Sequence, residues 1–187
     1  MTEADLPLME RWLATDHIVP WWGPAPTSQQ VATHYLPYIR REQPTDPYLI
    51  VVDGTTVGYV QTFRVADWPA FWPPGEPYDF EPEAAGLDLL IGVKALTGRR
   101  LGRQVIQEFV RDIVFIRPDV PACYADPAAG NLASLGAFRK AGYRRYRADR
   151  SARRFDASSA DAADARGARQ SSPLALVRPP RMNSSRD

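Results

Sequence analysis

Residues 86–92 read GLDLLIG and residues 97–103 read TGRRLGR, and these segments decide how the chain folds. Leu87 to Ile91 is short and mostly apolar, as expected of a buried β-strand, and Asp88 is the single carboxylate within it. After the basic loop, apolar residues recur with the period of one helix face, namely Leu101, Val105, Ile106, Phe109, Val110, Ile113 and Val114. The stretch therefore predicts a strand, a glycine-bearing loop and an amphipathic helix.

The loop between this strand and this helix combines glycines with arginines. Gly98 and Gly102 accompany Arg99, Arg100 and Arg103 at the expected start of the helix. Backbone N–H groups at a helix N-terminus, together with the helix dipole, form a favourable site for a phosphate group. An ordinary strand–loop–helix connection with solvated arginines has the same pattern, because short glycine motifs are common by chance. The loop alone leaves both interpretations open.

Length and composition restrict the class of protein. A chain of 187 residues is long enough for one domain with a substantial core, and a net charge of +1 argues against a nucleic-acid-binding surface. No apolar run reaches membrane-spanning length and the N-terminal residues do not resemble a signal peptide, so we expect no membrane association and a cytoplasmic location. Cys123 is the only cysteine, which excludes an intramolecular disulfide and a cysteine-based metal cluster, and we expect no metal site.

The remaining sequence predicts an α+β fold on a mixed sheet flanked by helices. Helices precede a hairpin, and strand and helix signals then alternate. In chain order we first expect a helix capped by Thr2 or Asp5 that buries Leu6, Met9 and Leu13, an aromatic loop at 17–24, and a helix opened by a Thr27–Gln30 capping box. A hairpin over 48–63 around Asp53-Gly54, a loop at 66–85 and a strand at 121–124 should follow. The last elements expected here are a helix capped by Asn131 with Leu132, Leu135 and Phe138 inward, and a strand at 143–147.

The loop at residues 66–85 has a one-sided charge. It contains no Lys, Arg or His, and its acids are Asp67, Glu76, Asp79, Glu81 and Glu83. Such a run is often only a solvated loop, but aromatic residues between the acids favour a binding role. We therefore consider two interpretations, a solvated loop and a wall of a site for a cationic molecule.

The C-terminal part changes in composition. Residues 148–172 are rich in Ala, Asp, Ser and Arg, with Phe155 the one large apolar side chain, so we expect a disordered insert there. The expected organisation is a folded domain over 1–147, this insert, a final strand at 173–178 and a loose tail at 179–187.

Several short stretches, in one order and at matching spacing, resemble the GNAT superfamily of N-acetyltransferases, and within it the aminoglycoside 6′-N-acetyltransferases. They are His17-Ile18-Val19-Pro20-Trp21-Trp22-Gly23, Tyr35-Leu36-Pro37, Val57-Gly58-Tyr59-Val60-Gln61, Gly86-Leu87-Asp88, Gly98 to Gly102, Asp126-Pro127 with Asn131-Leu132, and Lys140-Ala141-Gly142-Tyr143. The resemblance implies a mostly antiparallel GNAT-like sheet whose central strand–loop–helix binds acetyl-CoA. It also implies that the protein transfers the acetyl group to a primary amine of an aminoglycoside antibiotic, the 6′-amino group, and thereby gives resistance to the antibiotic.

The resemblance also implies a set of site residues. Asp88 matches the acidic residue at the acceptor amine, either as a base or as an electrostatic anchor. Residues implied to contact acetyl-CoA are Leu89, Leu90, Ile91, Gly98, Arg99, Arg100, Leu101, Gly102, Arg103, Asn131 and Phe138. Residues implied to line the aminoglycoside site are Trp21, Trp22, Tyr35, Gln61, Trp72, Asp88 and Asp126. The expected partner is a small molecule, and the expected assembly is a monomer or a homodimer.

The chain also departs from the family pattern. Arg100 stands where the family usually has glycine, and Phe138 stands where a tyrosine often lies near the coenzyme sulfur, so that Tyr143 and Tyr146 become the candidate proton donors. Two alternatives therefore stay open. One is a hydroxylysine N-acyltransferase of siderophore assembly with the same fold, and the other is a degenerate protein that only binds the coenzyme or the drug.

Overall fold

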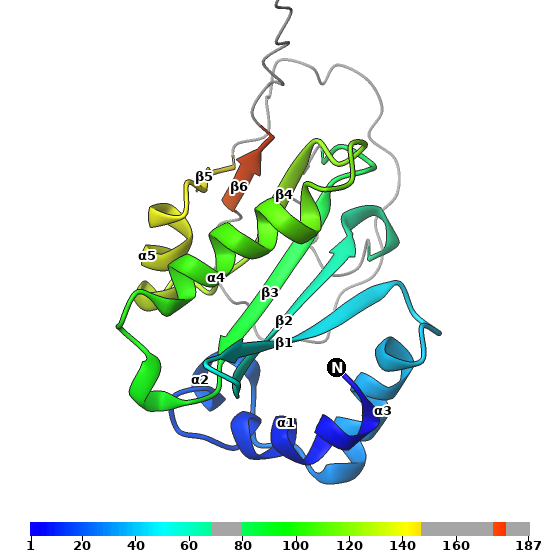
Figure 1. Cartoon of the computed structure of the whole chain (residues 1–187), viewed down its shortest axis with the longest axis vertical. Coiled ribbons are helices and arrows are strands. Elements are labelled where there is room, and N and C mark those ends of the chain that lie inside the picture. The colour runs from blue at the N-terminus through cyan, green and yellow to red at the C-terminus, as the bar shows by residue number, and fades with distance from the viewer. Residues whose placement is uncertain (69–79, 147–173, 179–187) are drawn as a thin grey trace, which may run out of the picture.

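The computed structural model of the chain describes residues 1–68, 80–146 and 174–178, which fold around one six-stranded sheet (Figure 1). The strands are β1 Thr45–Val52, β2 Thr55–Arg64, β3 Ala85–Ile91, β4 Ala122–Ala125, β5 Arg144–Arg145 and β6 Leu174–Val177. Their order is β1-β2-β3-β4-β6-β5, and of the neighbouring pairs only β3 and β4 run parallel. The α+β fold with a mixed, mostly antiparallel sheet is therefore confirmed.

Helices cover both faces of this sheet. They are α1 Leu6–Leu13, α2 Val19–Trp22, α3 Ser28–Ile39, α4 Leu101–Phe109 and α5 Leu132–Lys140. Successive strand residues point to opposite faces, so Val60 and Leu87 pack in the core with α4 and α5, while Tyr59 and Leu90 pack in the core with α1 and α3. Figure 1 shows α4 in front of the sheet and α1, α2 and α3 together at the lower end of the view.

The N-terminal helices follow most of the sequence signals, although Leu6 is half-buried rather than buried and Asp5, the N-cap residue of α1, makes no side-chain capping hydrogen bond. The capping box is confirmed, because the Thr27 N–H donates to Gln30 Oε1 at 2.8 Å and the Gln30 N–H donates to Thr27 Oγ1 at 3.3 Å. The loop expected at 17–24 is wrong in part, because Val19–Trp22 form the short helix α2. Pro20 does not prevent this turn, since it lies in the first turn, where a backbone N–H has no partner within the helix.

The β1–β2 hairpin is confirmed and sets the register of the centre of the sheet. Asp53 and Gly54 have φ values of 48° and 75°, the two positive values that a type I′ turn requires. Across the next pair, Gln61 of β2 lies directly opposite Asp88 of β3. The hairpin therefore brings a buried amide next to the one carboxylate of the central strand.

The β3 and β4 strands separate soon after they meet. Their parallel pairing covers Ala85 with Cys123 and Gly86 with Tyr124 only, after which β3 continues to Ile91 while β4 ends at Ala125. Gly86 is needed at the start, because a Cβ there would lie 2.3 Å from the Phe63 ring. From Leu87 to Ile91, the edge of β3 that faces away from β2 has no paired strand among the described residues.

The helix after β3 agrees with the predicted pattern and extends beyond α4. Val110 to Val114 continue α4 as one π-helical turn, so the apolar stripe covers residues 101–114. Helix α5 is capped as expected, with the Ser134 N–H donating to Asn131 Oδ1 at 3.0 Å. Leu132 was expected inward but is 76% exposed, because at about 100° per residue it lies well around the helix from the buried Phe138.

Arg178 follows the C-terminal strand directly and binds the segment that comes after the central helix. Its Nη2 donates to Phe115 O at 2.7 Å and to Arg117 O, its Nε donates to Val120 O at 2.9 Å, and its guanidinium lies 4.9 Å from the Phe115 ring. The β6 strand lies within the segment 173–178 and pairs with both β4 and β5. Of the strand expected at 143–147, the described residues 143–146 form the part Arg144–Arg145.

Some sequence expectations lie outside the described residues. These are the disordered insert at 148–172, the tail at 179–187, and residues 69–79 of the acidic loop, including Trp72. Within the three described ranges, no helix combines the length and apolar character needed to cross a membrane.

Replacing Arg178 tests how the last strand is held. We expect Arg178→Ala to lower the free energy of unfolding by about 1–3 kcal/mol, because charged hydrogen bonds to three carbonyl groups are lost. Guanidinium chloride unfolding followed by circular dichroism measures this, with Arg139→Ala on the exposed surface of α5 as the control. Equal stability of the two variants would contradict the role given to Arg178.

Candidate functional site

Asp88 is held by a side chain of the neighbouring strand. Gln61 Nε2 donates to Asp88 Oδ2 at 2.9 Å, and the Tyr59 hydroxyl donates to Gln61 Oε1 at 2.6 Å. Tyr59 is completely buried and Gln61 is 9% exposed, whereas Asp88 keeps part of its surface open. The carboxylate is therefore fixed at one oxygen within an otherwise apolar strand.

The surroundings make Asp88 a weaker acid than an ordinary aspartate. Burial raises its pKa to about 6, the negative charge of Asp126 raises it further, and the hydrogen bond from Gln61 acts in the opposite direction. At neutral pH the group is mostly ionised, but it can take up a proton more readily than a surface aspartate. A pKa close to the working pH is typical of a general base.

Aromatic side chains pack together on the face of the sheet that carries this carboxylate and that α1–α3 cover. The Tyr59 ring makes edge contacts with Trp22 at 6.4 Å and with Tyr35 at 5.5 Å, and Tyr38 makes one with Trp68 at 6.2 Å. We call Trp22, Tyr35, Tyr38, Tyr59 and Trp68 the aromatic wall. Of the residues implied to line the acceptor site, the structure brings Trp22, Tyr35, Gln61, Asp88 and Asp126 together.

The Trp21 side chain lies beside the loop before α5. A Cβ at Gly130 would be 3.7 Å from the Trp21 ring. Trp21 is thus near Asn131, which caps α5. Trp72 cannot be placed, since it lies outside the described residues.

The unpaired edge of β3 leads from Asp88 to the basic loop. Leu90 O points toward β2, 2.4 Å from where a Gly58 Cβ would be, so the alternating peptide groups of Leu89 and Ile91 point to the unpaired side. His17 Nε2 lies 3.0 Å from Ile91 O, so the last carbonyl group of this edge has a hydrogen-bond partner. A buried or half-buried peptide group requires a hydrogen-bond partner, so this edge can accept an extended amide-containing molecule.

Residues 98–103 form the turn that ends in α4. Gly98 and Arg100 have φ values of 72° and 70°, and Arg100 is the N-cap residue without a side-chain capping hydrogen bond. The N–H groups of the first helical turn consequently lack the usual side-chain acceptor. A Cβ at Gly102 would lie 3.6 Å from Ala137 Cβ, an ordinary contact distance, so α4 and α5 are neighbours at this turn.

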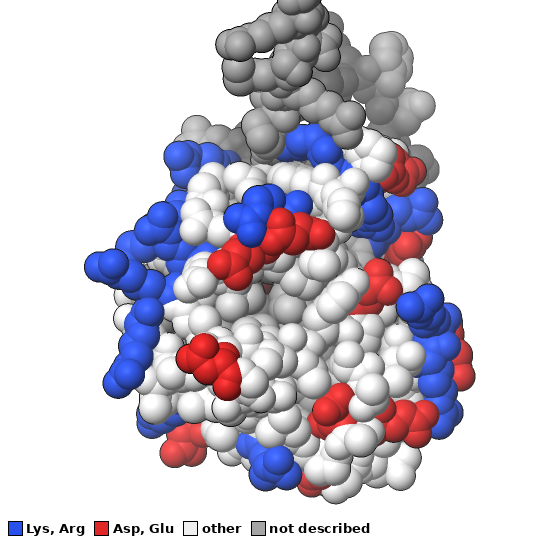
Figure 2. Space-filling view, in the orientation of Figure 1, with Lys and Arg blue, Asp and Glu red and all other residues white. Residues whose placement is uncertain are grey.

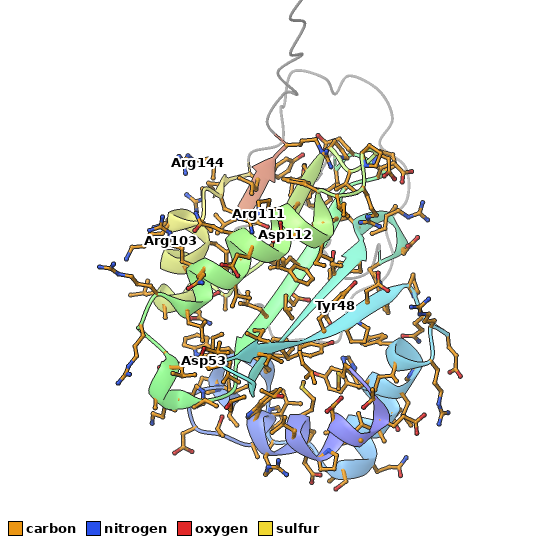
Figure 3. The ribbon with its side chains drawn as sticks, viewed as in Figure 1. Tyr48, Asp53, Arg103, Arg111, Asp112 and Arg144 are labelled. Atoms are coloured by element: carbon orange, nitrogen blue, oxygen red, sulfur yellow. The ribbon has the colours of Figure 1, made fainter. Side chains whose placement is uncertain are left out.

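Positive charge gathers on this side of the molecule. Figure 2 shows Lys and Arg side chains along the left edge, and Figure 3 shows Arg103 and Arg144 extending from the same flank. The exposed cations near the starts of α4 and β5 are Arg99, Arg100, Arg103, Arg139, Lys140, Arg144 and Arg145. An anionic group would be attracted to the first turn of α4.

The two tyrosines considered as proton donors differ in exposure, since Tyr143 is buried and Tyr146 is half-buried. Tyr143 is completely buried beside Cys123 and the Phe138 ring, and burial raises its pKa well above the ordinary value. Tyr146 instead packs with Phe80 and Tyr124. Phe138 is itself buried in the core that includes α4 and α5.

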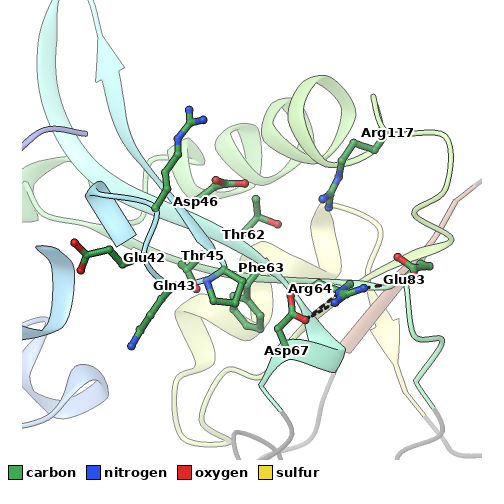
Figure 4. Close-up of a pocket in the computed structure, with 12 residues that line it drawn as sticks. Glu42, Gln43, Thr45, Asp46, Thr62, Phe63, Arg64, Asp67, Glu83 and Arg117 are labelled. Carbon is green, nitrogen blue, oxygen red and sulfur yellow. Dashed lines mark hydrogen bonds and ion pairs between the residues drawn. The ribbon is translucent and has the colours of Figure 1, made fainter. Parts of the chain in front are cut away.

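The described acids of the loop at 66–85 already have partners. Asp67 and Glu83 lie 2.5 Å and 3.7 Å from Arg64, and Glu81 accepts a hydrogen bond from Tyr124 at 2.7 Å. Figure 4 shows Arg64, Asp67 and Glu83 at a cavity of about 610 Å³ near the end of β2, which includes none of the predicted site residues. These three acids therefore do not support the loop as the cation-binding wall.

Sequence reasoning missed three residues that take part in this arrangement. Tyr59 follows from strand alternation, since it lies two positions before Gln61 on the same face of β2. Tyr38 is three positions after Tyr35 on α3, which places both on one helix face. The contact of His17 with Ile91 joins residues far apart in the chain and has no local signal. Within the described ranges, no group of His, Cys, Asp and Glu could hold a metal ion.

Comparison with known proteins agrees with this geometry. Residues 1–149 match the family described as acetyltransferase (GNAT) domain. The chain is 30% identical over 149 residues to aminoglycoside N(6′)-acetyltransferase type 1 of Klebsiella pneumoniae, covering 78% of this chain and 72% of that protein, and equally similar to the protein of the same name from Serratia marcescens.

Solved structures give the same result. The crystal structure of aminoglycoside acetyltransferase AAC(6′)-Ib with coenzyme A is 26% identical with a TM-score of 0.75, covering 95% of this chain and 92% of that chain. The structure of AAC(6′)-Ib with paromomycin and acetyl-CoA is 26% identical with a TM-score of 0.76, covering 95% and 90%. The extent of the family match and the identity of these relatives together place the protein: this chain belongs to the GNAT acetyltransferase family.

Proposed function

We propose that the protein transfers an acetyl group from acetyl-CoA to a primary amine of an aminoglycoside, the 6′-amino group. The observation that carries this proposal is the partly exposed Asp88 carboxylate, held by Gln61, beside the aromatic wall and on the strand with the unpaired edge. The named relatives, two of which were crystallised with coenzyme A or acetyl-CoA, support it.

The residues near the unpaired edge fit acetyl-CoA. The N–H and C=O of Leu89 and the N–H of Ile91 face the unpaired side and suit an amide-bearing arm, and the first turn of α4 with Arg99 and Arg103 suits a pyrophosphate. The same turn includes Gly98, Arg100, Leu101 and Gly102, and Asn131 and Leu90 are the further candidates for contact. The coenzyme supplies the acetyl group as a thioester.

Asp88 is the residue assigned to the acceptor amine. A primary ammonium group must lose a proton before it can act as a nucleophile, and an ionised carboxylate within reach can accept that proton directly or through water. The same negative charge also attracts and orients the ammonium group. Both roles require Asp88 in its ionised form.

A polycationic sugar is the acceptor that the surroundings of Asp88 suit best. Asp88 and Asp126 place two carboxylates close enough to influence each other, and the aromatic wall offers flat apolar surface to a sugar ring. Hydroxylysine has its own carboxylate, which these two negative charges would repel. The aminoglycoside is therefore favoured over the hydroxylysine acceptor.

Turnover with and without the Asp88 carboxylate tests the proposal. We expect the wild-type protein to release free thiol from acetyl-CoA with kanamycin, and Asp88→Asn to reduce kcat by about 10²–10⁴-fold, the range for loss of a general base. Calorimetry should give nearly the same Kd for acetyl-CoA in both proteins. The control is Asp112→Asn, which removes an exposed carboxylate paired with Arg111 on the π-helical turn.

Two results would contradict the proposal. Undiminished kcat in Asp88→Asn would exclude Asp88 as base or anchor. Thiol release with a hydroxylysine acceptor but none with kanamycin would replace the aminoglycoside, and release with neither would indicate a protein that only binds its ligands.

Replacing Arg100 separates its backbone role from its side-chain role. Arg100→Gly should raise the free energy of unfolding by about 0.5–1 kcal/mol, because glycine adopts a positive φ without the penalty of a side chain. Binding of acetyl-CoA should stay equal or become tighter, since the N–H groups of the turn are kept. Thermal unfolding and calorimetry measure the two effects.

Arg41→Gly is the matched control for this experiment. Arg41 has a φ of 59° after the end of α3, away from the basic loop, so this variant should gain stability without any change in coenzyme binding. A large loss of coenzyme affinity in Arg100→Gly alone would show that the Arg100 side chain is itself a phosphate ligand.

A further inference from the structure

Two hydrogen bonds in series connect the aromatic wall to Asp88. The Tyr59 hydroxyl donates to Gln61 Oε1 at 2.6 Å, and Gln61 Nε2 donates to Asp88 Oδ2 at 2.9 Å. Tyr59 and Gln61 lie two positions apart on β2, so both side chains point to the same face of the sheet, and Gln61 is opposite Asp88 in the register. All three groups are therefore brought together by the strands themselves.

The direction of the two bonds is fixed by the chemistry of the groups. An ionised carboxylate only accepts hydrogen bonds, so the Gln61 amide must present its nitrogen to Asp88 and its oxygen to the other side. On that side Tyr59 offers a hydroxyl proton. Burial raises the pKa of Tyr59 far above its ordinary value, so this hydroxyl stays protonated and remains a donor.

The position of Tyr59 is itself fixed on both sides. Its ring makes edge contacts with Trp22 from α2 and with Tyr35 from α3, at 6.4 Å and 5.5 Å. The adjacent Gly58 lets β2 and β3 lie close together, because a Cβ there would be 2.4 Å from Leu90 O. The hydroxyl thus has little freedom to move away from the Gln61 amide.

We propose that Tyr59 is a positioning residue for acetyl transfer, acting through the Gln61 amide to hold one oxygen of Asp88 so that the other oxygen meets the acceptor amine. This inference rests on the proposed function for its kinetic consequences. The hold on Asp88 is a property of the protein alone and can be measured without any substrate.

Several titratable groups act on Asp88 besides the Gln61 amide, and the substitution used to test Tyr59 changes the charge of none of them. The titratable groups whose charges interact with Asp88 come from α3, β2, β4 and the turn after β4, and they are Tyr35, Tyr38, Tyr59, Cys123 and Asp126. Tyr59→Phe removes one neutral hydroxyl from this set and no charge. A change in the titration of Asp88 would consequently come from the looser Gln61 amide.

The first measurement follows the Asp88 carboxyl carbon by ¹³C NMR as a function of pH, with Asp88→Asn for assignment. In Tyr59→Phe we expect the pKa of Asp88 to rise above the wild-type value, because the hydrogen bond from Gln61 lowers it. Tyr48→Phe is the matched control, since Tyr48 packs against Phe109 on the opposite face of the sheet. The same pKa in Tyr59→Phe and wild type would overturn the inference.

The second measurement is a double-mutant cycle on kcat with kanamycin. We expect Tyr59→Phe to lower kcat about tenfold, the factor that corresponds to one hydrogen bond, with the KM for acetyl-CoA unchanged. If Tyr59 acts through Gln61, the double variant with Gln61→Ala will be no slower than Gln61→Ala alone. Additive losses would overturn the inference and make Tyr59 an independent structural residue.

The two measurements separate the two proposals. A wild-type protein that acetylates no aminoglycoside would contradict the proposed function. The NMR titration would still decide whether Tyr59 holds the Gln61–Asp88 pair, because it needs neither coenzyme nor acceptor.

Discussion

The separation of β3 from β4 after two paired residues is the constraint on which the rest of the structure depends. A strand inside a sheet normally satisfies its peptide groups on both sides, but beyond Gly86 the described residues pair β3 with a strand on the β2 side alone. The chain keeps this edge in place by three means. Phe63 packs on Gly86, Trp12 packs on Gly92, and His17 contacts the carbonyl of Ile91. Within the part of the chain that the structure describes, the edge is therefore held in position without a strand paired to it.

This edge brings the two charged regions of the molecule next to one another. Toward its C-terminal end it leads to a turn with two positive φ values, exposed arginines and the first turn of α4. On the face toward α1–α3 it carries Asp88, which Gln61 holds and Asp126 influences. An anionic donor and a cationic acceptor would thus be attracted to adjacent parts of one strand. The raised pKa of Asp88 is the consequence of placing a carboxylate there with limited access to water.

Signals that are local in sequence predicted most of the fold. The Thr27–Gln30 capping box, the Asp53-Gly54 turn and the Asn131 cap depend on neighbouring residues alone, and the structure contains all three. The expectation that Leu132 points inward is wrong, because its apolar character was given more weight than its position around the helix relative to Phe138. The helical turn at Val19–Trp22 was missed because Pro and Gly around it suggested a loop.

The contacts that join distant segments at the site were harder to predict than the local elements of the fold. The acids of the loop looked unpaired, yet Arg64 lies just before the loop and contacts two of them. Asp88 is indicated by its place as the single carboxylate of an apolar strand, and Gln61 by the resemblance, whereas Tyr59 and His17 take part through side-chain contacts that only the folded chain defines. Sequence thus indicates the carboxylate that we propose acts on the amine, and the structure is needed to show what holds it.

The pH dependence of kcat/KM for the amine acceptor tests the central claim most directly, that an ionised Asp88 with a raised pKa meets the amine. In the wild-type protein, kcat/KM should decrease as the pH falls through about 6, since protonated Asp88 can neither accept a proton nor attract the ammonium group. Asp126→Asn removes a neighbouring negative charge, so it should move this decrease to lower pH whatever its effect on the absolute rate. A wild-type profile without a decrease between pH 7 and 5, or an unchanged profile in Asp126→Asn, would contradict the claim.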